Sequence, residues 1–546
     1  MRKPIDRQQT ERPRVRSIHY SFVAAMSILV LIAACQTTDE APPEGEASTS
    51  EEGEESATED AGTEDAGEGG TLVYVQAEDI HNFDPTQTPF GNVVLHYQLF
   101  DSLIELDADD EPQPALATDW SLSDDGLAIT FQLREDVEFH DGEPFTAEHV
   151  AYNVERYQNP DVAAQMRGVI EWIDDVEVTG NHELVLHFDE PRPAIWHGLS
   201  QLFITQEGTE EEILSTPVGT GPFMLENYSP GNEARFVPNE AYWRDGPHVD
   251  ELIVRIVPDA QAAAISLETG EAHIYSGPSW QDLERLEAVD GVEATLSDRA
   301  PWMQDLMLNT RREPLDDPRV RQAIHHAVDR DRVVQIAYSG FSEPWCLPWH
   351  EASAAFDDEL ARNCPQDLDR ARELLADAGY EDGFTIEITV WDGGINVVGR
   401  DLANILREDL AEIGIDLEIA VFEPGEARTR LFDHNFDLFA HTVASVWADP
   451  SILFDGSALW SPDPDRNMSG YADEEFTSLV EEASTTLDDE ARRDIFDQIN
   501  RDHMVENVWV LGIARYDAAF AHSDAISGLE VGLAAQPILR DVRLAE

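Results

Sequence analysis

The sequence predicts an α/β protein, and two stretches with regular apolar patterns carry this prediction. Residues 112–157 read as a β-hairpin that leads into a helix, and residues 368–421 alternate helix, strand, helix and strand. A βαβ rhythm of this kind is typical of a parallel sheet. From residue 71 to the end, the chain is long enough for two or three domains.

The predicted hairpin turns at Ser123–Gly126, because aspartate bonds its own backbone and glycine accepts a positive φ. Alternating apolar residues then predict a strand that contains Leu127, Ile129, Phe131 and Leu133. Thr146 is the expected N-cap of the following helix, with His149 in the position of a capping box.

The second stretch predicts helix 368–378, strand 384–390, helix 398–413 and strand 415–421. Gly379 and Gly414 are expected to end the two helices, since glycine readily adopts the left-handed cap conformation. Nearer the N-terminus, a strand is expected at 72–75 and a helix at 94–103. The two glycines of segment 217–223 predict a sharp turn. A dinucleotide-binding loop is not indicated, because no third glycine opens a helix afterwards.

Residues 1–35 are expected to be a lipoprotein signal peptide. Six basic residues lie within the first 16, and a 13-residue apolar run follows from Phe22 to Ala34. The run is shorter than the roughly 20 residues that span a bilayer, but it suits a signal peptide. It ends in Ile-Ala-Ala-Cys, which looks like a bacterial lipobox, so Cys35 is the expected lipidation site. The structural alternative is a buried cysteine at the end of a helix.

Residues 36–70 are expected to form a disordered acidic linker. They hold 13 acidic residues and neither basic nor aromatic ones, so they cannot bury enough apolar surface to fold. Such a charged segment tethers a folded domain at a distance from the membrane.

The charge of the whole chain is strongly negative. It has 111 acidic and 35 basic residues, a net charge of −76, and Lys3 is the only lysine. Self-repulsion of this size is weakened by salt, so the composition predicts a halophilic protein. An acidic protein from an ordinary habitat is the alternative. A nucleic-acid partner is not expected, because no basic patch exists to neutralise phosphates.

The three cysteines indicate one disulfide. If Cys35 carries lipid, Cys346 and Cys364 remain as an even pair outside the cytoplasm, where a disulfide is expected. A metal-binding pair is the weaker alternative, because no CxxC or neighbouring histidine spacing supports it.

Short motifs follow one another along the chain in a distinctive order. They are Pro-Ala-Leu-Ala at 114–117, Ser-Asp-Asp-Gly at 123–126, Phe-His-Asp-Gly at 139–142, Gly-Thr-Gly-Pro at 219–222, Asn-Glu-Ala-Tyr-Trp at 239–243 and Asp-Pro-Arg-Val-Arg at 317–321. This order resembles the peptide/nickel/oligopeptide family of solute-binding proteins, the family 5 receptors of ABC importers. The resemblance covers most of residues 71–546.

The resemblance implies a periplasmic-binding-protein-like type II fold, with two lobes around a ligand cleft and an additional inserted domain. Lobe I is then expected at 71–113, 218–305 and 510–546. The inserted small domain is expected at 114–217, and lobe II at 306–509.

The resemblance also implies ligand-facing positions. In peptide-binding members, an aspartate three residues before the acid of an Asp/Glu-Pro pair holds the α-amine of the peptide. Val446 occupies that position here, before Asp449-Pro450. The expected ligand-binding residues are Phe90, Trp302, His441, Ser445, Val446 and Trp447.

Trp345 and Trp349 are further candidates for stacking on a ligand, although any of these tryptophans, and His441, also suits core packing. Because indoles stack on sugar faces, the tryptophans favour an oligosaccharide or another neutral solute as the alternative ligand.

The expected function is that of a monomeric, extracytoplasmic receptor held to the membrane by its lipid. It would capture a peptide or similar small solute and deliver it to ABC permease subunits. No catalytic residue, metal or cofactor is expected, and His325 and His326 point to different faces of one helix. A lipid-anchored hydrolase is a weaker alternative, because no GxSxG or HExxH motif is present. A sensor with the same fold is not distinguished by sequence.

Overall fold

The computed structural model describes residues 69–545 except 81, 88–92, 108–109, 163, 165–166, 210–211, 392–397, 445–448, 457–458 and 533–536. All of them belong to one compact unit, Thr63–Glu546. The predicted signal peptide with Cys35, and nearly all of the predicted linker, lie outside the described residues. Within the described part of the chain, no helix has the length and apolarity needed to cross a bilayer.

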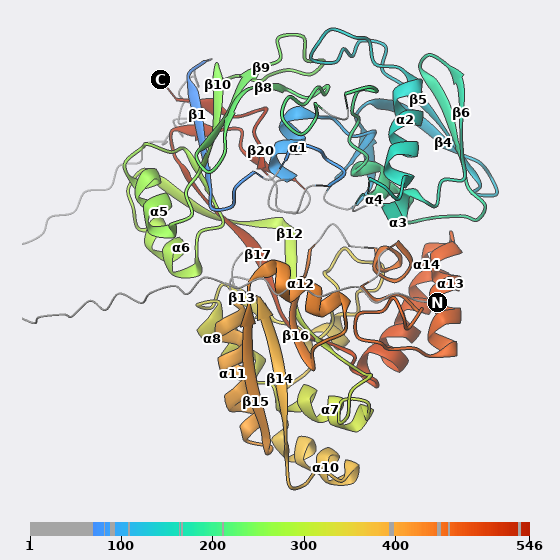
Figure 1. Ribbon diagram of the computed structural model, residues 1–546, viewed down its shortest axis with the longest axis vertical. Coiled ribbons are helices and arrows are strands. Elements are labelled where there is room, and N and C mark those ends of the chain that lie inside the picture. Colours follow the sequence, from blue (N-terminus) through green and yellow to red (C-terminus); the bar gives the residue numbers. More distant parts are fainter. Residues whose placement is uncertain are drawn as a thin grey trace, which may run out of the picture. The chain divides into compact units, whose positions relative to one another are not determined.

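A four-stranded antiparallel sheet occupies the segment expected as the inserted domain (Figure 1). Its strands, in spatial order, are β4 (Ala117–Leu122), β5 (Ala128–Leu133), β7 (Glu183–His187) and β6 (Asp175–Gly180). The predicted turn at Ser123–Gly126 joins β4 to β5, with Gly126 at a φ of 70°.

Helices α2 (Ala147–Gln158), α3 (Arg167–Ile170) and α4 (Ile195–Ser200) share one hydrophobic core with this sheet. The predicted start of α2 is confirmed, since the N–H of Thr146 donates to Nδ1 of His149 over 3.1 Å. This bond satisfies a polar group that the start of a helix leaves without an intrahelical partner. Val150, Val154 and Tyr157 then face the core.

An 11-stranded mixed sheet forms the backbone of the remaining described residues. Its strands, in spatial order, are β15 (Ile415–Phe422), β14 (Phe384–Trp391), β16 (Leu438–Ala444), β12 (Val292–Leu308), β17 (Val510–Ser523), β11 (Ile274–Ser276), β1 (Thr71–Gln76), β10 (Glu251–Ile256), β9 (Glu233–Pro238) and β8 (Phe223–Ser229), while β13 (Ser342–Pro344) also pairs with β17. Three two-stranded sheets consist of β2 (Ile104–Leu106) with β3 (Pro112–Pro114), β18 (Ile526–Ser527) with β21 (Arg543–Leu544), and β19 (Glu530–Val531) with β20 (Pro537–Ile538).

The βαβ prediction is confirmed. Strands β14 and β15 pair in parallel through α11 (Gly399–Ala411), and α10 (Leu368–Ala378) ends at Gly379 with a φ of 87°. The helix expected at 94–103 is wrong at its C-terminal end, because α1 (Val93–Leu99) stops four residues earlier. There Ser102 bridges to Phe203 and the chain extends into β2.

Strands β12 and β17 pair along most of their length and connect the two ends of the large sheet. Their pairing register shifts between Ser297 and Pro301 and again between Gln304 and Asp305. The boundary expected between residues 305 and 306 falls inside β12, so both expected lobes draw on this one strand.

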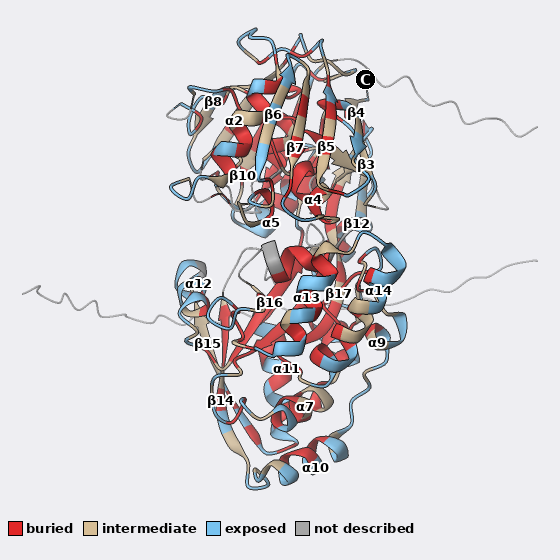
Figure 2. Ribbon diagram, turned by 90° about the vertical axis from the view of Figure 1, so that its right-hand side faces the viewer, coloured by how far each residue is buried: buried red, intermediate tan, exposed pale blue. Residues whose placement is uncertain are grey.

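Alternate residues of β12 face two different cores, as the two-residue period of a strand requires. Leu306 and Leu308 pack in one core, whereas Met303 and Met307 pack in the other. The first core includes α7 (Pro318–Ala327), α8 (Arg330–Ala337), α10 and α11, and the second includes α9 (Asp358–Arg362), α12 (Pro424–Phe432), α13 (Glu474–Thr485), α14 (Asp489–Gln498) and the π-helical turns η3 (Ile452–Gly456) and η4 (Ile499–Val505). Helices α5 (Ala260–Glu268) and α6 (Trp280–Glu287) pack beside β1, β10 and β11. Buried residues follow the inner strands such as β17, whereas β6 and the outer faces of the helices carry exposed ones (Figure 2).

The two glycines of segment 217–223 allow close packing and do not form a left-handed turn. Neither Gly219 nor Gly221 has a positive φ, and a Cβ on either residue would overlap the backbone of Leu99 at the end of α1. The chain bends at residues 220–222, as the sequence predicts, but neither glycine supplies a left-handed conformation there. Their missing side chains let two backbones approach each other.

Candidate functional site

A cavity of about 580 Å³ lies against the four-stranded sheet, a volume typical of small-molecule sites. One wall comes from residues 110–112, from β4 and β5, and from the segment 188–197. The other wall comes from residues 351–354, Asp449 and residues 487–493. Apolar side chains, including those of Ile129, Phe188 and Trp196, share the lining with charged groups.

The wall at residues 351–354 belongs to a loop that is fixed from inside. The structure joins Cys346 to Cys364 by a disulfide, with 6.0 Å between their Cα atoms. Nε1 of Trp345 donates to the carbonyl oxygen of Trp349 over 2.7 Å, and Nε1 of Trp349 donates to Oδ1 of Asn500 over 2.8 Å. Both indoles are fully buried in the second core, so neither lines the cavity.

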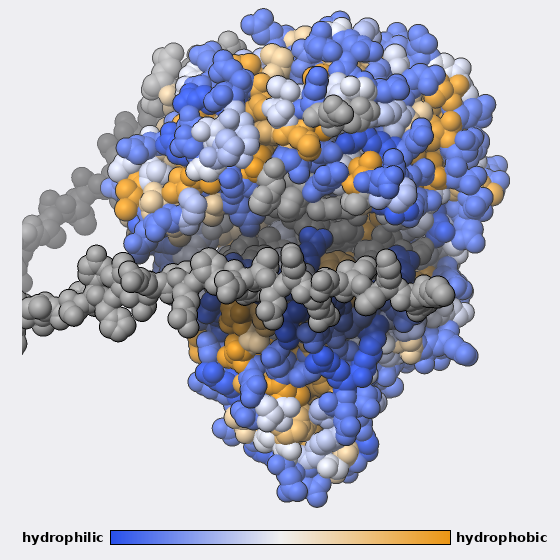
Figure 3. Space-filling model, viewed as in Figure 1, coloured by the Kyte–Doolittle hydropathy of each residue, from blue (hydrophilic) through white to orange (hydrophobic). Residues whose placement is uncertain are grey.

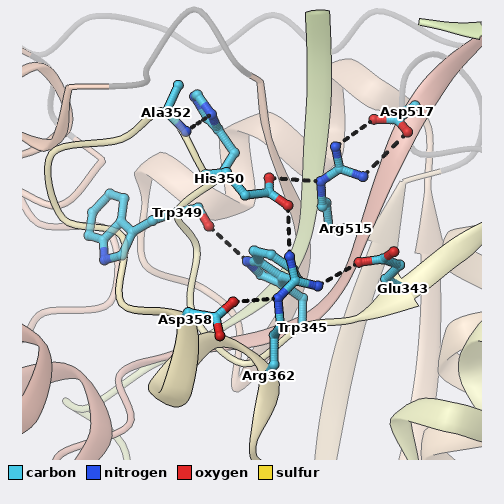
Figure 4. A network of polar contacts seen from close by, with 10 residues as sticks. Glu343, Trp345, Trp349, His350, Ala352, Asp358, Arg362, Arg515 and Asp517 are labelled. Carbon is cyan, nitrogen blue, oxygen red and sulfur yellow. Dashed lines mark hydrogen bonds and ion pairs between the residues drawn. The ribbon is translucent and has the colours of Figure 1, made fainter. Parts of the chain in front are cut away.

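Two arginines hold the same loop from outside (Figure 4). Glu351 accepts hydrogen bonds from Arg362 over 2.9 Å and from Arg515 over 3.1 Å. Arg362 also donates to Glu343 over 2.7 Å and to Asp358 over 2.8 Å. The Glu351 carboxylate is therefore already paired, and the loop is anchored to β13, α9 and β17.

Asp449 forms a buried ion pair with Arg492 of α14. Both carboxylate oxygens accept from the guanidinium over 2.6 Å, and Arg492 also donates to Oγ of Ser451 over 2.8 Å. Burial acts to raise the pKa of the Asp449 carboxyl, but the Arg492 charge outweighs it and holds that pKa below its usual range. The pair fixes the acid of the Asp-Pro motif and engages both carboxylate oxygens of Asp449.

Three polar side chains around the cavity have few partners. Oδ2 of Asp110 lies 3.7 Å from Nε2 of His197, too far for a hydrogen bond. His197 is only 9% exposed, and neither of its ring nitrogens has a hydrogen-bond partner among the described residues. Next to the other wall in the sequence, Nδ1 of His350 accepts from the N–H of Ala352 over 3.2 Å. Within the same described residues, Nε2 of His350 has no partner, and burial lowers the pKa of this imidazole.

The structure places two of the residues expected to bind ligand inside the large sheet. Trp302 on β12 is 8% exposed and packs in the first core. His441 on β16 lies opposite Asp305 of β12, and its Nδ1 is 3.1 Å from Oδ1 of that buried aspartate. Neither Trp302 nor His441 lines the cavity. Phe90, Ser445, Val446 and Trp447 lie outside the described residues.

Sequence reasoning missed Asp110, His197 and Arg492. The Asp-Pro motif pointed to Asp449, and an acid at that position invites a search for a buried arginine. No local pattern marks Asp110 or His197, because they become neighbours only through the pairing of β2 with β3 and the packing of α4. Across the described ranges, no group of three or more histidine, cysteine, aspartate or glutamate side chains is arranged to hold a metal ion.

The chain belongs to the bacterial extracellular solute-binding proteins, family 5, the receptors of ABC importers, because the model of that family matches residues 111–463. The motif resemblance and the expected type II periplasmic-binding-protein fold are thereby confirmed.

Individual relatives differ in the ligands that their names state. The chain is 26% identical over 445 residues to heme-binding protein A of Haemophilus influenzae, covering 75% of this chain and 81% of that protein. It is 30% identical over 418 residues to a probable di/tripeptide-binding protein 5 of Pseudomonas aeruginosa, covering 70% and 78%. A solved structure of a dipeptide-binding protein from Pseudoalteromonas sp. SM9913, in complex with Met-Leu, has a TM-score of 0.77 at 25% identity and covers 87% of this chain and 100% of that one.

Proposed function

We propose that this protein is an extracytoplasmic receptor that binds a peptide or a similar small solute and delivers it to an ABC permease. The observation that carries the proposal is the cavity between the inserted domain and the segments 351–354, 449 and 487–493. Its walls come from segments far apart in the sequence, as in a site that closes around its ligand. Because the lining combines apolar and charged side chains, it suits a ligand that has both kinds of group.

A peptide ligand has more support than a sugar. Two of the similar proteins are named for di- or tripeptides, or carry a dipeptide. Trp345 and Trp349, which favoured sugars, are buried in the second core, and Trp196 is the one tryptophan among the described residues of the cavity lining. The receptor binds its ligand without transforming it.

The membrane attachment in this proposal is a lipid on Cys35, with residues 36–70 as the tether. Its test is the Cys35→Ser variant expressed in a lipoprotein-processing bacterial host. The parent protein is expected to fractionate with membranes and to incorporate radiolabelled palmitate, whereas the variant is expected to do neither. Palmitate labelling that persists in Cys35→Ser would overturn the assignment.

The ligand class is tested by native mass spectrometry of the purified protein in high salt, followed by denaturation and identification of the released molecules. A series of short peptides is the expected result. An oligosaccharide mass would overturn the peptide assignment and keep the receptor class. Hydrolysis of an added peptide by the purified protein would overturn the receptor assignment itself.

A further inference from the structure

We propose that Ile452 and Leu487 form an apolar latch, fixed by the Asp449–Arg492 ion pair, that holds the two walls of the cavity together. The inference rests on the proposed receptor function in one respect, because opening of the cavity serves to admit and release a solute. The latch joins the wall at the four-stranded sheet to the wall that contains Asp449 and residues 487–493. It consists of two contacts that are distant in the sequence and share one support.

Ile452 of η3 belongs to the core of the four-stranded sheet. Its side chain is fully buried, and every other buried member of that core among the described residues lies between positions 103 and 204. The turn η3 contacts α3, whose Val169 and Ile170 are buried in the same core. The next residue, Leu453, is equally buried but packs in the second core. Adjacent side chains of one turn therefore enter two different cores.

Leu487 makes the second contact, from the connection between α13 and α14. It reaches the turn between β4 and β5, because a Cβ placed on Gly126 would lie 2.6 Å from Cδ1 of Leu487. Both residues line the cavity, and Leu487 is 42% exposed. This contact therefore lies at the edge of the cavity, whereas the contact of Ile452 is fully buried.

The Asp449–Arg492 ion pair supports both contacts. The main-chain carbonyl of Asp449 accepts from the N–H of Ile452 over 3.1 Å, and its carboxylate accepts from the N–H of Ser451 over 2.9 Å. Arg492 lies on α14, which begins two residues after Leu487. A buried ion pair adds little stability once both charges are desolvated, but this one fixes the spacing of the two latch residues. They are therefore expected to leave the opposite wall together.

The latch can open while the second core stays folded. The cavity of about 580 Å³ separates the two walls beside the latch, and apolar contacts have no preferred direction. Opening exposes the side chain of Ile452 to water, which disfavours the open form. A solute that touches both walls adds its binding energy to the closed form only. The latch and the solute therefore favour the same form of the protein.

The test is hydrogen–deuterium exchange of the full-length protein in high salt, read by mass spectrometry and without any ligand. The reporter is α3, where the amides of Glu171, Trp172 and Ile173 donate to carbonyl oxygens within that helix. Such amides exchange through local opening, so their rate follows the population of the open form. Leu487→Ala is the main variant, since it removes the contact at Gly126 and leaves Ile452 in place.

Leu487→Ala is expected to speed exchange at α3 roughly 3- to 10-fold, and Ile452→Ala roughly 10- to 100-fold, because less apolar surface holds the walls together. The control for the first variant is Ile336→Ala, which truncates an exposed apolar residue of α8. The control for the second is Leu453→Ala, which truncates a residue as buried as Ile452 but in the second core. Both controls should exchange at α3 as the parent does.

Exchange at the parent rate in Leu487→Ala would show that the two contacts open independently, and it would overturn the latch. Equal effects of Ile452→Ala and Leu453→Ala at α3 would also overturn it, since they would reflect a general loss of stability. Neither result depends on peptide binding. Failure of the purified protein to bind any peptide or other solute would instead overturn the receptor function that the latch is proposed to serve.

Discussion

Arg156 of α2 and Asp84 form a doubly hydrogen-bonded ion pair that ties α2 to the opening segment of the fold. The two bonds measure 3.1 Å and 2.6 Å, and the side chains of Arg156 and Asp84 are 7% and 3% exposed. Asp84 also accepts from the N–H and the hydroxyl of Thr86. The Phe-Asp-Pro turn that the sequence shows at 83–85 is therefore an anchor for a helix more than 70 positions away.

Removal of one partner of this pair is expected to destabilise the protein strongly, because it leaves an uncompensated buried charge. Arg156→Met should lower the free energy of unfolding by about 3–5 kcal/mol, measured by urea unfolding in high salt. The control is Arg370→Met, which removes an exposed pair with Glu373 and should cost about 0.5 kcal/mol or less. Equal losses in the two variants would contradict this role of Asp84 and Arg156.

Gly219→Ala is expected to disrupt the fold, because the new Cβ would overlap the carbonyl oxygen of Leu99. Backbone atoms cannot move aside as the end of a flexible side chain can, so α1 must shift. The control is Gly425→Ala on α12, where a Cβ meets nothing within 4 Å and alanine favours a helix. Thermal unfolding should show a large loss in the first variant and none in the second. A wild-type melting temperature for Gly219→Ala would refute the packing argument.

The Cys346–Cys364 disulfide is expected to contribute about 3 kcal/mol to stability, since it closes a loop across a sequence separation of 18 residues. The double variant Cys346→Ser/Cys364→Ser should lose that amount in urea unfolding. Thiol counting on the denatured Cys35→Ser protein should find no free cysteine before reduction and two afterwards. Two free thiols without reductant would rule the disulfide out in the isolated protein.

The stability should fall as the pH is lowered through the range in which buried histidines resist protonation. Burial lowers the pKa of His140 to about 4 and that of His96 to about 3, whereas unfolded histidine titrates near pH 6.5. Between these values the unfolded chain binds more protons than the folded one, so the free energy of unfolding rises with pH. The stability that these two histidines contribute is fully present above about pH 6.5. It is lost progressively as the pH falls to about 4 for His140 and to about 3 for His96.

Replacement of His140 by asparagine should reduce the slope of the free energy of unfolding against pH. The reduction is at most about 1.4 kcal/mol per pH unit, which corresponds to one proton. The measurement is urea unfolding at several pH values in the parent and in His140→Asn. Identical slopes would show that His140 titrates alike in both states. The variant also loses the bonds of the ring to Gly219 and Gly221, so its stability is compared as a slope and not at one pH.

Structure should be lost in dilute buffer, because a net charge of −76 repels itself when screening is weak. Hydrophilic residues dominate the face shown in Figure 3, in keeping with this composition. Circular dichroism during dialysis from molar to millimolar KCl should report unfolding. Sucrose at matched osmolarity, which does not screen charge, should not substitute for KCl. A flat signal down to dilute buffer would contradict the halophilic prediction.

The sequence was sufficient for elements that depend on local rules. The 123–126 turn, the α2 cap at Thr146 and the parallel pairing of β14 with β15 follow from turn chemistry, capping and apolar period. The end of α1 and the role of Gly219 did not follow, because both depend on backbones that meet only after folding. The same reason hid Asp110 and His197, whose proximity no spacing in the sequence encodes. Trp345 and Trp349 suited ligand stacking and core packing equally well until their burial was known.

The crosslinked loop between Cys346 and Cys364 also bears on how the protein is made. Cytosolic thiols stay reduced, so a newly synthesised chain lacks this link until it has crossed the membrane. Without the disulfide, the wall of the cavity at residues 351–354 is held only by non-covalent contacts, those of the two arginines and of the two buried indoles. Secretion and maturation of the receptor are thus coupled. The disulfide that crosslinks the loop of the cavity wall forms only in the compartment where the solute is found.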